Sequence, residues 1–284
     1  MIVVALFGGL GNQMFQYANA KALALRNKAS LKIDSQFFNE KYQQRANSTL
    51  RNYELSVFNL TVEKASPYIV NLLAPLLSLK TKGGFDVNIA LNPLFIYENK
   101  QFTFQSIRSW KFFYLYGYWQ SWRYFQSYEY VIRNEFIFKN SLTGKNLELL
   151  NKVRNTQSVS VHVRLGDYRQ GNLLPMTYYN EAIGLMKKKI PNATFFVFSD
   201  NPDQAKAYFK DLDFEIVHKN NGSDSYIDMQ LMSNCKYNII ANSSFSWWGA
   251  WLNNYSYKIV IAPSIWYNNC TDTNDILPPD WIKI

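Results

Sequence analysis

SVSVHVRLGDY, at residues 158–168, is a short strand that ends in charged and turn-forming residues. Three valines alternate with polar residues, which is the period of a β-strand, and Gly166 and Asp167 then break the pattern. Ligands of open α/β sheets bind outside the carboxyl ends of strands, so Arg164 is placed where its planar fork can hold a phosphate. A local ion pair between Arg164 and Asp167 would produce the same sequence pattern. The pattern therefore does not decide between a phosphate site and an ion pair.

Strands and helices continue to alternate from this stretch to the end of the chain. This alternation predicts a parallel α/β sheet whose polar strand ends share one edge, which brings together Arg164, Asp200 and the residues Asn242-Ser243-Ser244. The last three also cap the next helix, where unpaired N–H groups suit a phosphate, although serines at a helix start are most often plain N-caps. We expect strands at 158–164, 193–198, 214–217, 237–241 and 258–262, and helices at 177–189, 203–210 and 226–234.

The first half opens with a strand, a glycine loop and a helix. Residues 2–7 are apolar, 8–12 read GGLGN, and a helical stretch runs through residue 25. The glycines allow a ligand close to the backbone, but the spacing is not GxGxxG, and the motif by itself favours a tight strand-to-helix turn. Residues 66–80 predict a broken amphipathic helix that packs on the core or touches a membrane surface.

Twelve of the 21 residues between 110 and 130 are aromatic. That number exceeds what one buried helix face accommodates, so some rings could line a groove and stack on sugars, with Gln120 bonding hydroxyl groups. The alternative is a core helix with amphipathic aromatic residues at its rim.

Composition limits the class of protein. The 284 residues suit two domains of ordinary size or one large domain, and the content of 48% apolar and 18% charged residues excludes a disordered chain. The formal charge of +9 favours an anionic partner such as nucleic acid, a membrane face or a phosphorylated small molecule. Two cysteines without a CxxC pair, and no basic leader before the first apolar run, predict a reducing cytoplasm. Asp211 and Asp213 form a DxD pattern, but they precede a strand at the opposite edge, and with only two histidines we expect no metal.

Five motifs are distinctive: GGLGNQMFQYA at 8–18, GYWQS at 117–121, HVRLGDY at 162–168, FSD at 198–200 and NSSFSWWGAWLN at 242–253. Together they resemble those of glycosyltransferase family 11, the α-1,2-fucosyltransferases. The resemblance implies a GT-B fold, with two facing Rossmann-like domains and a cleft between them: an acceptor-side domain at 1–150 and a GDP-sugar-binding domain at 151–284. It also implies inverting transfer of L-fucose from GDP-fucose to the 2-hydroxyl of a terminal galactose, on an oligosaccharide or a lipid-linked glycan, without a metal or other cofactor.

The resemblance also implies roles for single residues. Arg164 would bind the diphosphate with His162 beside it, and Asp228 would hold the guanosine. Leu165 and Asn201 stand where the family commonly has a second arginine and often a second aspartate. The remaining implied donor contacts are Ser243, Ser244 and Phe245 at the phosphates, and Gly9, Gly11 and Asn12 near the transferred sugar.

The expected catalytic set is Arg164, Asp167 and His162. Arg164 and the helix end at Ser244 would stabilise the departing GDP, and Asp167 would take the acceptor proton or, alternatively, orient Arg164. The other hypotheses are a different GDP-sugar or linkage, and a non-catalytic protein that binds polysaccharide or nucleic acid through basic and aromatic residues. We expect no nucleic-acid partner, and the positive charge allows peripheral contact with the inner membrane surface.

Overall fold

A computed structural model describes residues 1–39, 50–73, 93–165, 173–209, 214–217, 220–267, 270 and 272–284. The chain forms two compact units, unit 1 at Met1–Lys139 and unit 2 at Asn140–Ile284. A division after residue 150, as expected from the sequence, would fall inside helix α5 (Gly144–Asn155), which belongs to unit 2 as a whole. None of the helices in the described ranges combines the length and the apolar character needed to cross a membrane.

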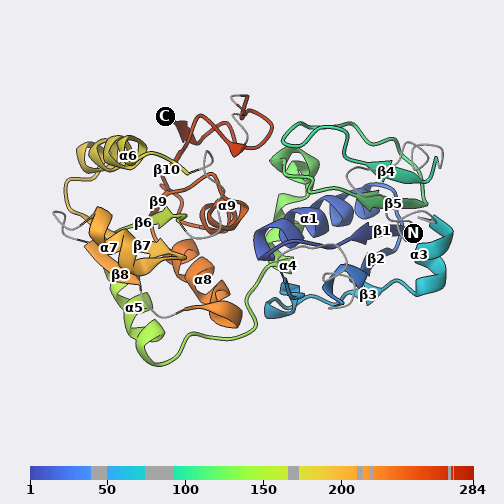
Figure 1. The fold of residues 1–284 in the computed structure, drawn as a ribbon, viewed down its shortest axis with the longest axis horizontal. Coiled ribbons are helices and arrows are strands. Elements are labelled where there is room, and N and C mark those ends of the chain that lie inside the picture. Colours follow the sequence, from blue (N-terminus) through green and yellow to red (C-terminus); the bar gives the residue numbers. More distant parts are fainter. Residues whose placement is uncertain are drawn as a thin grey trace. The chain divides into compact units, whose positions relative to one another are not determined.

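Unit 1 is built on a parallel sheet with the described strand order β3-β2-β1-β5-β4 (Figure 1). Its central strand β1 reads IVVA and is buried at every position, which is typical of a parallel strand covered on both faces. Its elements are β1 (Ile2–Ala5), α1 (Leu10–Arg26), β2 (Leu31–Asp34), η1 (Gln36–Phe38), η2 (Leu55–Val57), β3 (Glu63–Lys64), α3 (Pro67–Leu73), β4 (Phe95–Tyr97), β5 (Phe113–Tyr116), η4 (Trp122–Tyr124), η5 (Gln126–Tyr128) and α4 (Glu129–Glu135).

The aromatic stretch at 110–130 is a strand followed by short helical turns, so the core-helix interpretation is wrong. Strand β5 pairs with β1 and β4, and Phe113, Tyr114 and Leu115 are fully buried because both faces of this strand are covered. Trp119 and Phe125 extend this buried set beyond the strand. Side-chain volume on the two faces of a central strand therefore accounts for part of the aromatic excess.

Helix α3 covers the first half of the amphipathic helix predicted at 66–80. Val70 and Leu73 are buried in a core cluster that also contains Val3 and Tyr114, whereas Tyr68 and Leu72 are exposed. The second half of the prediction, from residue 74 on, lies outside the described residues.

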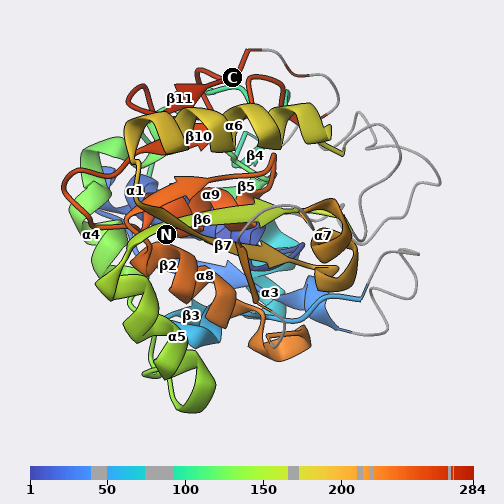
Figure 2. The same cartoon turned by 90° about the vertical axis from the view of Figure 1, so that its left-hand side faces the viewer.

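Unit 2 contains a second parallel sheet, with the described order β11-β10-β9-β6-β7-β8. Helices α6 and α7 cover one face, and α5, α8 and α9 lie on the other (Figures 1 and 2). Strand β11 was not predicted from the sequence. The elements are α5, β6 (Gln157–Val163), α6 (Met176–Lys189), β7 (Ala193–Ser199), α7 (Pro202–Tyr208), β8 (Phe214–Val217), η6 (Gly222–Asp224), α8 (Tyr226–Asn234), β9 (Tyr237–Ile239), α9 (Ser244–Trp251), β10 (Val260–Ala262) and β11 (Ile282–Lys283).

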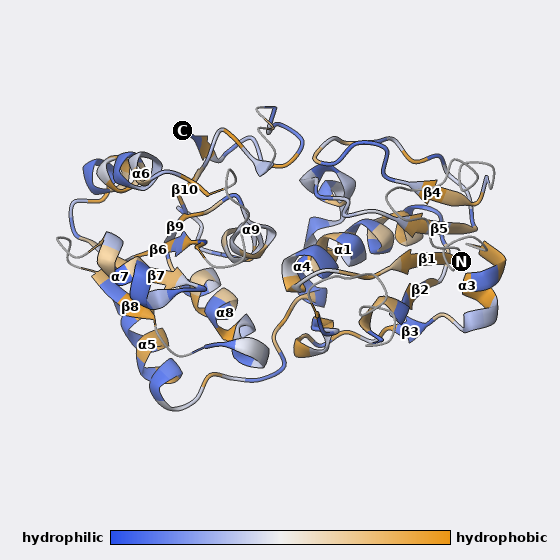
Figure 3. Ribbon diagram, viewed as in Figure 1, coloured by the Kyte–Doolittle hydropathy of each residue, from blue (hydrophilic) through white to orange (hydrophobic). Residues whose placement is uncertain are grey.

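Alternation along β6 determines which side chains reach each face of this sheet. Val159, Val161 and Val163 pack into the core under α6 and α7. Ser160 and His162 therefore point to the opposite face, where α8 and α9 lie. Figure 3 shows the hydropathy of the elements in colour: β1 and β5 of unit 1 are hydrophobic, whereas helix α5 carries both hydrophilic and hydrophobic positions.

Candidate functional site

The carboxyl ends of three neighbouring strands of unit 2 bring polar side chains to one edge. Strand β6 lies between β9 and β7, and both pairings are parallel. Arg164 follows β6, Asp200 follows β7, and Ser243 follows β9 by a few residues. The structure therefore places these residues at the same edge, where open α/β sheets bind their ligands.

Arg164 is held by a carboxylate from the adjacent strand. Its Nε lies 3.0 Å from Oδ2 of Asp200, and the other oxygen of Asp200 accepts a hydrogen bond of 2.8 Å from the backbone N–H of Leu165. Asp200 thus fixes both the arginine and the chain that follows it. Sequence reasoning noted the FSD motif but missed this role, while Asp167, the predicted base, lies outside the described residues.

His162 is a buried, neutral imidazole at the same edge. It is 4% exposed, and its ring centroid lies 5.8 Å from that of Phe245. Burial, assisted by the nearby charge of Arg164, lowers the pKa of His162 to about 4, and the charge of Asp200 partly opposes this shift. Its Nδ1 is buried without a hydrogen-bond partner among the described residues, and such an atom destabilises the fold unless a ligand or water bonds to it.

Helix α9 begins at this edge and is anchored by tryptophans. Ser243 is its N-cap, with Oγ accepting a 3.3 Å hydrogen bond from the N–H of Phe245. Trp247 and Trp248 are fully buried, and the indole N–H of Trp247 donates to the carbonyl of Ile276 at 2.9 Å. The motif therefore combines a rigid helix body with a first turn whose N–H groups and positive dipole end suit an anion.

A buried polar network joins the strands to the helices behind the edge. Nδ2 of Asn238 donates to Oγ of Ser160 at 2.7 Å and to the carbonyl of Met232 at 2.9 Å. Oδ1 of Asn238 in turn accepts a 2.8 Å hydrogen bond from Asn253. These bonds tie β6, β9 and the ends of α8 and α9 together, which limits how far α9 can move relative to His162.

Asp228, predicted to hold guanosine, lies in the first turn of α8. It is 9% exposed, and Oδ1 accepts a 2.6 Å hydrogen bond from Nδ2 of Asn220, whose side chain also bonds to Asn146 of α5. Burial raises the pKa of Asp228 to about 7, although the Asn220 bond acts in the opposite direction. Because α8 follows β8, its first turn lies at the carboxyl edge of the same sheet.

The glycine loop of unit 1 is braced by the GYWQS segment. Gly8 has φ +76°, and a Cβ there would lie 2.7 Å from Nδ2 of Asn12, so a larger residue would clash. Oδ1 of Asn12 accepts a 2.7 Å hydrogen bond from Nε2 of Gln120. Gly9 differs, since a Cβ added there would have its nearest neighbours, on Arg51 and Glu54, at 3.9 and 4.0 Å. The structure thus leaves space beside Gly9, whereas a side chain at Gly8 would clash and the side chain of Asn12 is held by its hydrogen bond.

Glu98 supports the GYWQS segment that braces this loop, and its role was missed from the sequence. It is 4% exposed, and its two oxygens accept hydrogen bonds from the N–H groups of Tyr118 at 2.7 Å and Trp119 at 3.0 Å. Burial raises the pKa of Glu98 to about 7, against the effect of these two bonds. Trp119 has φ +56°, which is a strained conformation for a bulky residue, and the two bonds hold the backbone in it.

A metal-binding cluster is not found in the described part of either unit. No group of three or more histidine, cysteine, aspartate or glutamate side chains has the required geometry there. Asp211 and Asp213, which we rejected as a metal signature, lie outside the described residues. The described ionisable groups at the unit 2 edge include Arg164, Asp200 and Asp228, and the start of α9 adds a partial positive charge.

Comparison with known proteins gives consistent results over the whole chain. The family described as Glycosyl transferase family 11 matches residues 1–284. An alpha-1,2-colitosyltransferase of Escherichia coli is 34% identical over 305 residues, covering 100% of this chain and 99% of that protein. The O-antigen biosynthesis glycosyltransferase WbnK of Escherichia coli is 30% identical over 306 residues, covering 98% and 99%.

The fold is also similar to that of solved structures. The fucosyltransferase NodZ from Bradyrhizobium has a TM-score of 0.54 at 18% identity, covering 88% of this chain and 91% of NodZ. A structure of NodZ soaked with GDP-fucose has a TM-score of 0.52 at 18% identity, covering 88% and 92%. Together with the two parallel sheets, this similarity confirms the predicted α/β class with two Rossmann-like domains of GT-B type.

Proposed function

The chain belongs to glycosyltransferase family 11, and we propose from this that it transfers L-fucose from GDP-fucose to the 2-hydroxyl of a terminal galactose, with inversion. Transferase chemistry follows from the family, and the donor, linkage and acceptor are our proposal. The observation that carries it is the edge of unit 2, where Arg164, the unpartnered Nδ1 of His162 and the start of α9 converge in the described structure. This combination suits a diphosphate.

Arg164 and α9 would stabilise the leaving group. As the bond between the sugar and the diphosphate breaks, negative charge develops on a phosphate oxygen. The Arg164 guanidinium, oriented by Asp200, and the positive dipole end of α9 at Ser244 and Phe245 would stabilise that charge without reorganisation. Ser243 contributes by fixing the first turn, since its Oγ is already bonded to the N–H of Phe245.

His162 acts as a neutral hydrogen-bonding group in this proposal, and not as a proton carrier. With a pKa near 4, the imidazole carries no charge at neutral pH and is a weak base. Its buried Nδ1 would bond to an oxygen of the bound donor, which satisfies an atom that has no protein partner among the described residues.

Asp228 would read the guanine base. A carboxylate accepts two hydrogen bonds from the N1–H and 2-amino groups of guanine, a donor pair that uracil and adenine do not present together. The buried position in the first turn of α8, at the same sheet edge, supports this role. Asn220 would then orient the carboxylate through its 2.6 Å bond.

The acceptor proton needs a base, and Asp167 remains our proposal for it. The alternative role that the sequence allowed for Asp167, orienting Arg164, is filled by Asp200. In unit 1, Gly9, Gly11 and Asn12 would contact the transferred sugar, with Gln120 holding the amide of Asn12 in place. The cytoplasmic location, the absence of a nucleic-acid partner and the independence from metal stay predictions.

The proposal is tested by incubating the purified chain with GDP-fucose and a panel of galactosides, and by determining the linkage of each product by NMR. We expect an α-1,2-fucosyl galactoside and release of GDP. A product with another linkage, or transfer from other GDP-sugars only, would contradict it. One alternative has specific support: a relative is named as an alpha-1,2-colitosyltransferase, so activated colitose belongs in the donor panel.

A further inference from the structure

Two large aromatic side chains are exposed immediately before strand β5. Trp110 is 55% and Phe112 is 50% exposed, whereas the next residue, Phe113, is fully buried. Isolated exposed hydrophobic residues are ordinary on protein surfaces. Two large rings two positions apart, at the start of a strand that is otherwise buried, form a local apolar patch.

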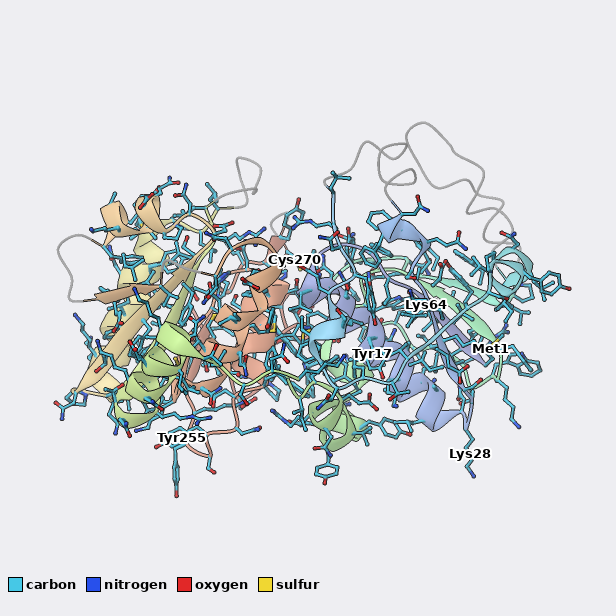
Figure 4. All side chains as sticks on the ribbon, turned by 90° about the horizontal axis from the view of Figure 1, so that it is seen from below. Met1, Tyr17, Lys28, Lys64, Tyr255 and Cys270 are labelled. Carbon is cyan, nitrogen blue, oxygen red and sulfur yellow. The ribbon has the colours of Figure 1, made fainter. Side chains whose placement is uncertain are left out.

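Basic side chains surround this patch. Arg108 and Lys111 lie in the same segment and are exposed. Exposed Lys28 lies in the turn after α1, and its neighbour Asn27 joins that turn to the segment through a 2.8 Å bond to the carbonyl of Trp110. Met1 lies at the same end of unit 1 as Lys28 (Figure 4), and its carbonyl accepts a 3.2 Å bond from the N–H of Phe113. We call Lys28, Arg108, Trp110, Lys111 and Phe112 the strand-start surface.

The positive charges of the strand-start surface are not neutralised within the described structure. Lys28, Arg108 and Lys111 form no ion pair with a described carboxylate, whereas Lys32 of β2 is paired with Glu63 at 2.8 Å. The described segments that lead into β2, β4 and β5, at 26–30, 93–94 and 106–112, contain no aspartate or glutamate. The surface therefore presents three cations beside two rings.

We propose that the strand-start surface binds the surface of an anionic lipid bilayer. Tryptophan and phenylalanine partition into the interface between headgroups and acyl chains, and lysine and arginine are attracted to lipid phosphates. Single-stranded nucleic acid also uses rings and cations, but it requires them spaced along a groove that follows the strand. Here both rings come from one three-residue segment, which favours insertion at a planar interface.

Helix α3 extends the apolar contact. Val70 and Leu73 pack with Met1 against the same core cluster, so α3 lies beside the strand starts, as Figure 1 also shows. Its other side exposes Tyr68 at 76% and Leu72 at 64%. A bilayer that contacts Trp110 and Phe112 therefore has further apolar side chains nearby.

The proposed membrane surface is separate from the ligand edge of unit 1. Gly9 and Asn12 follow the carboxyl end of β1, whereas the strand-start surface lies at its amino end. A four-residue strand spans roughly 13 Å. Bilayer binding should therefore leave the glycine loop accessible, and changes at the strand-start surface should not alter transfer to a water-soluble acceptor.

The test measures flotation of the full chain with vesicles of phosphatidylcholine, with and without phosphatidylglycerol. We expect binding only to the anionic vesicles. The triple change Lys28→Asn, Arg108→Gln and Lys111→Gln should weaken it on the order of a hundredfold, since each charge near the surface contributes about fivefold. Asparagine is chosen at position 28 because it tolerates the positive φ of 49° found there. Separately, Trp110→Ser with Phe112→Ser should reduce the binding that survives high salt.

Matched controls remove the same charge, or another pair of exposed aromatic rings, elsewhere in the chain. Lys187, Lys188 and Lys189 are three exposed lysines in the last turn of α6, and changing all three to glutamine alters net charge by the same amount. Tyr130 and Tyr257, each 78% exposed, serve for the aromatic pair. The controls should retain binding, and all variants should keep their melting temperature and their transfer to a soluble galactoside.

Several outcomes would overturn the proposal. These are no binding to anionic vesicles, equal loss in the α6 lysine control, or unchanged vesicle binding in both strand-start variants. If the strand-start variants lose binding to single-stranded RNA but keep their binding to vesicles, the surface binds nucleic acid instead. If the unmodified chain fails to transfer sugar, this would contradict the proposed function, but the vesicle-binding result would still stand by itself.

Discussion

Changing Asp228 to asparagine should stabilise the unliganded protein above neutral pH and, at the same time, abolish its preference for guanine nucleotides. The structure gives the reason for both effects. The carboxyl group is 9% exposed, and it accepts a hydrogen bond from the amide of Asn220 at 2.6 Å. Asparagine retains an acceptor oxygen for that bond but never ionises.

The magnitude follows from the pKa of Asp228, which burial raises from 3.8 to about 7. A carboxyl group whose folded pKa is raised contributes stability below its unfolded pKa, and that stability is lost as pH rises through the folded value. A difference of about three pH units corresponds to about 4 kcal/mol. The unchanged protein should therefore lose stability between pH 4 and pH 7, and the variant should exceed it by up to about 4 kcal/mol at pH 8.

Guanine-nucleotide binding should strengthen as pH rises, whereas the stability of the unliganded protein falls. The guanine contact requires the carboxylate, whose population falls roughly tenfold between pH 8 and pH 6 if the pKa is about 7. GDP should therefore raise the melting temperature of the unchanged protein more at pH 8 than at pH 6, and more than UDP or ADP does. The Asp228→Asn variant should show no such preference and no such pH dependence.

The assay is thermal unfolding across this pH range, with and without each nucleotide. Asp224→Asn is the matched control, because Asp224 is exposed in the turn that leads into the same helix. It should change neither stability by more than about 0.5 kcal/mol nor nucleotide preference. The reasoning is refuted if Asp228→Asn is less stable than the parent at pH 8, or if it still distinguishes GDP from UDP as strongly.

Three further predictions concern the diphosphate, metal dependence and the unit 1 loop. Arg164→Lys should lower kcat/KM about a hundredfold, because an ammonium group cannot reproduce the planar guanidinium that Asp200 orients. The control Arg154→Lys should leave kcat/KM unchanged. Near-normal turnover of the Arg164→Lys variant would contradict the role of Arg164 at the diphosphate. Sugar transfer should persist in excess EDTA, and loss reversed by magnesium or manganese would disprove metal independence. Gly117→Ala should destabilise the fold by more than about 2 kcal/mol, because the added Cβ would lie 2.4 Å from the Cβ of Glu98. Gly184→Ala should instead stabilise the fold by about 0.5–1 kcal/mol, because Gly184 lies on α6 with open space around it. Chemical denaturation measures both changes in the free energy of unfolding.

The sequence by itself determined the features that depend on neighbouring residues. Strand β8 and helix α8 begin and end where alternation and periodicity predicted them, at 214–217 and 226–234. Ser243 caps α9 as its position before the helix indicated, and the polar strand ends of unit 2 share one edge because parallel strands leave no other arrangement. These outcomes follow from local propensity, capping and the direction of the chain.

The tertiary structure decided which distant side chains meet. Asp200 reaches the backbone of Leu165 across 35 positions, and Gln120 reaches Asn12 across 108. Glu98 holds the strained turn at Trp119 without any local signature that would reveal it. The aromatic run at 110–130 became a central strand because β1 and β4 pair with it on both sides, and burial on two faces overrides the periodicity of a single segment. Such contacts depend on how strands pair and on which buried polar groups need a protein partner in place of water. Neither is encoded within one stretch of the chain.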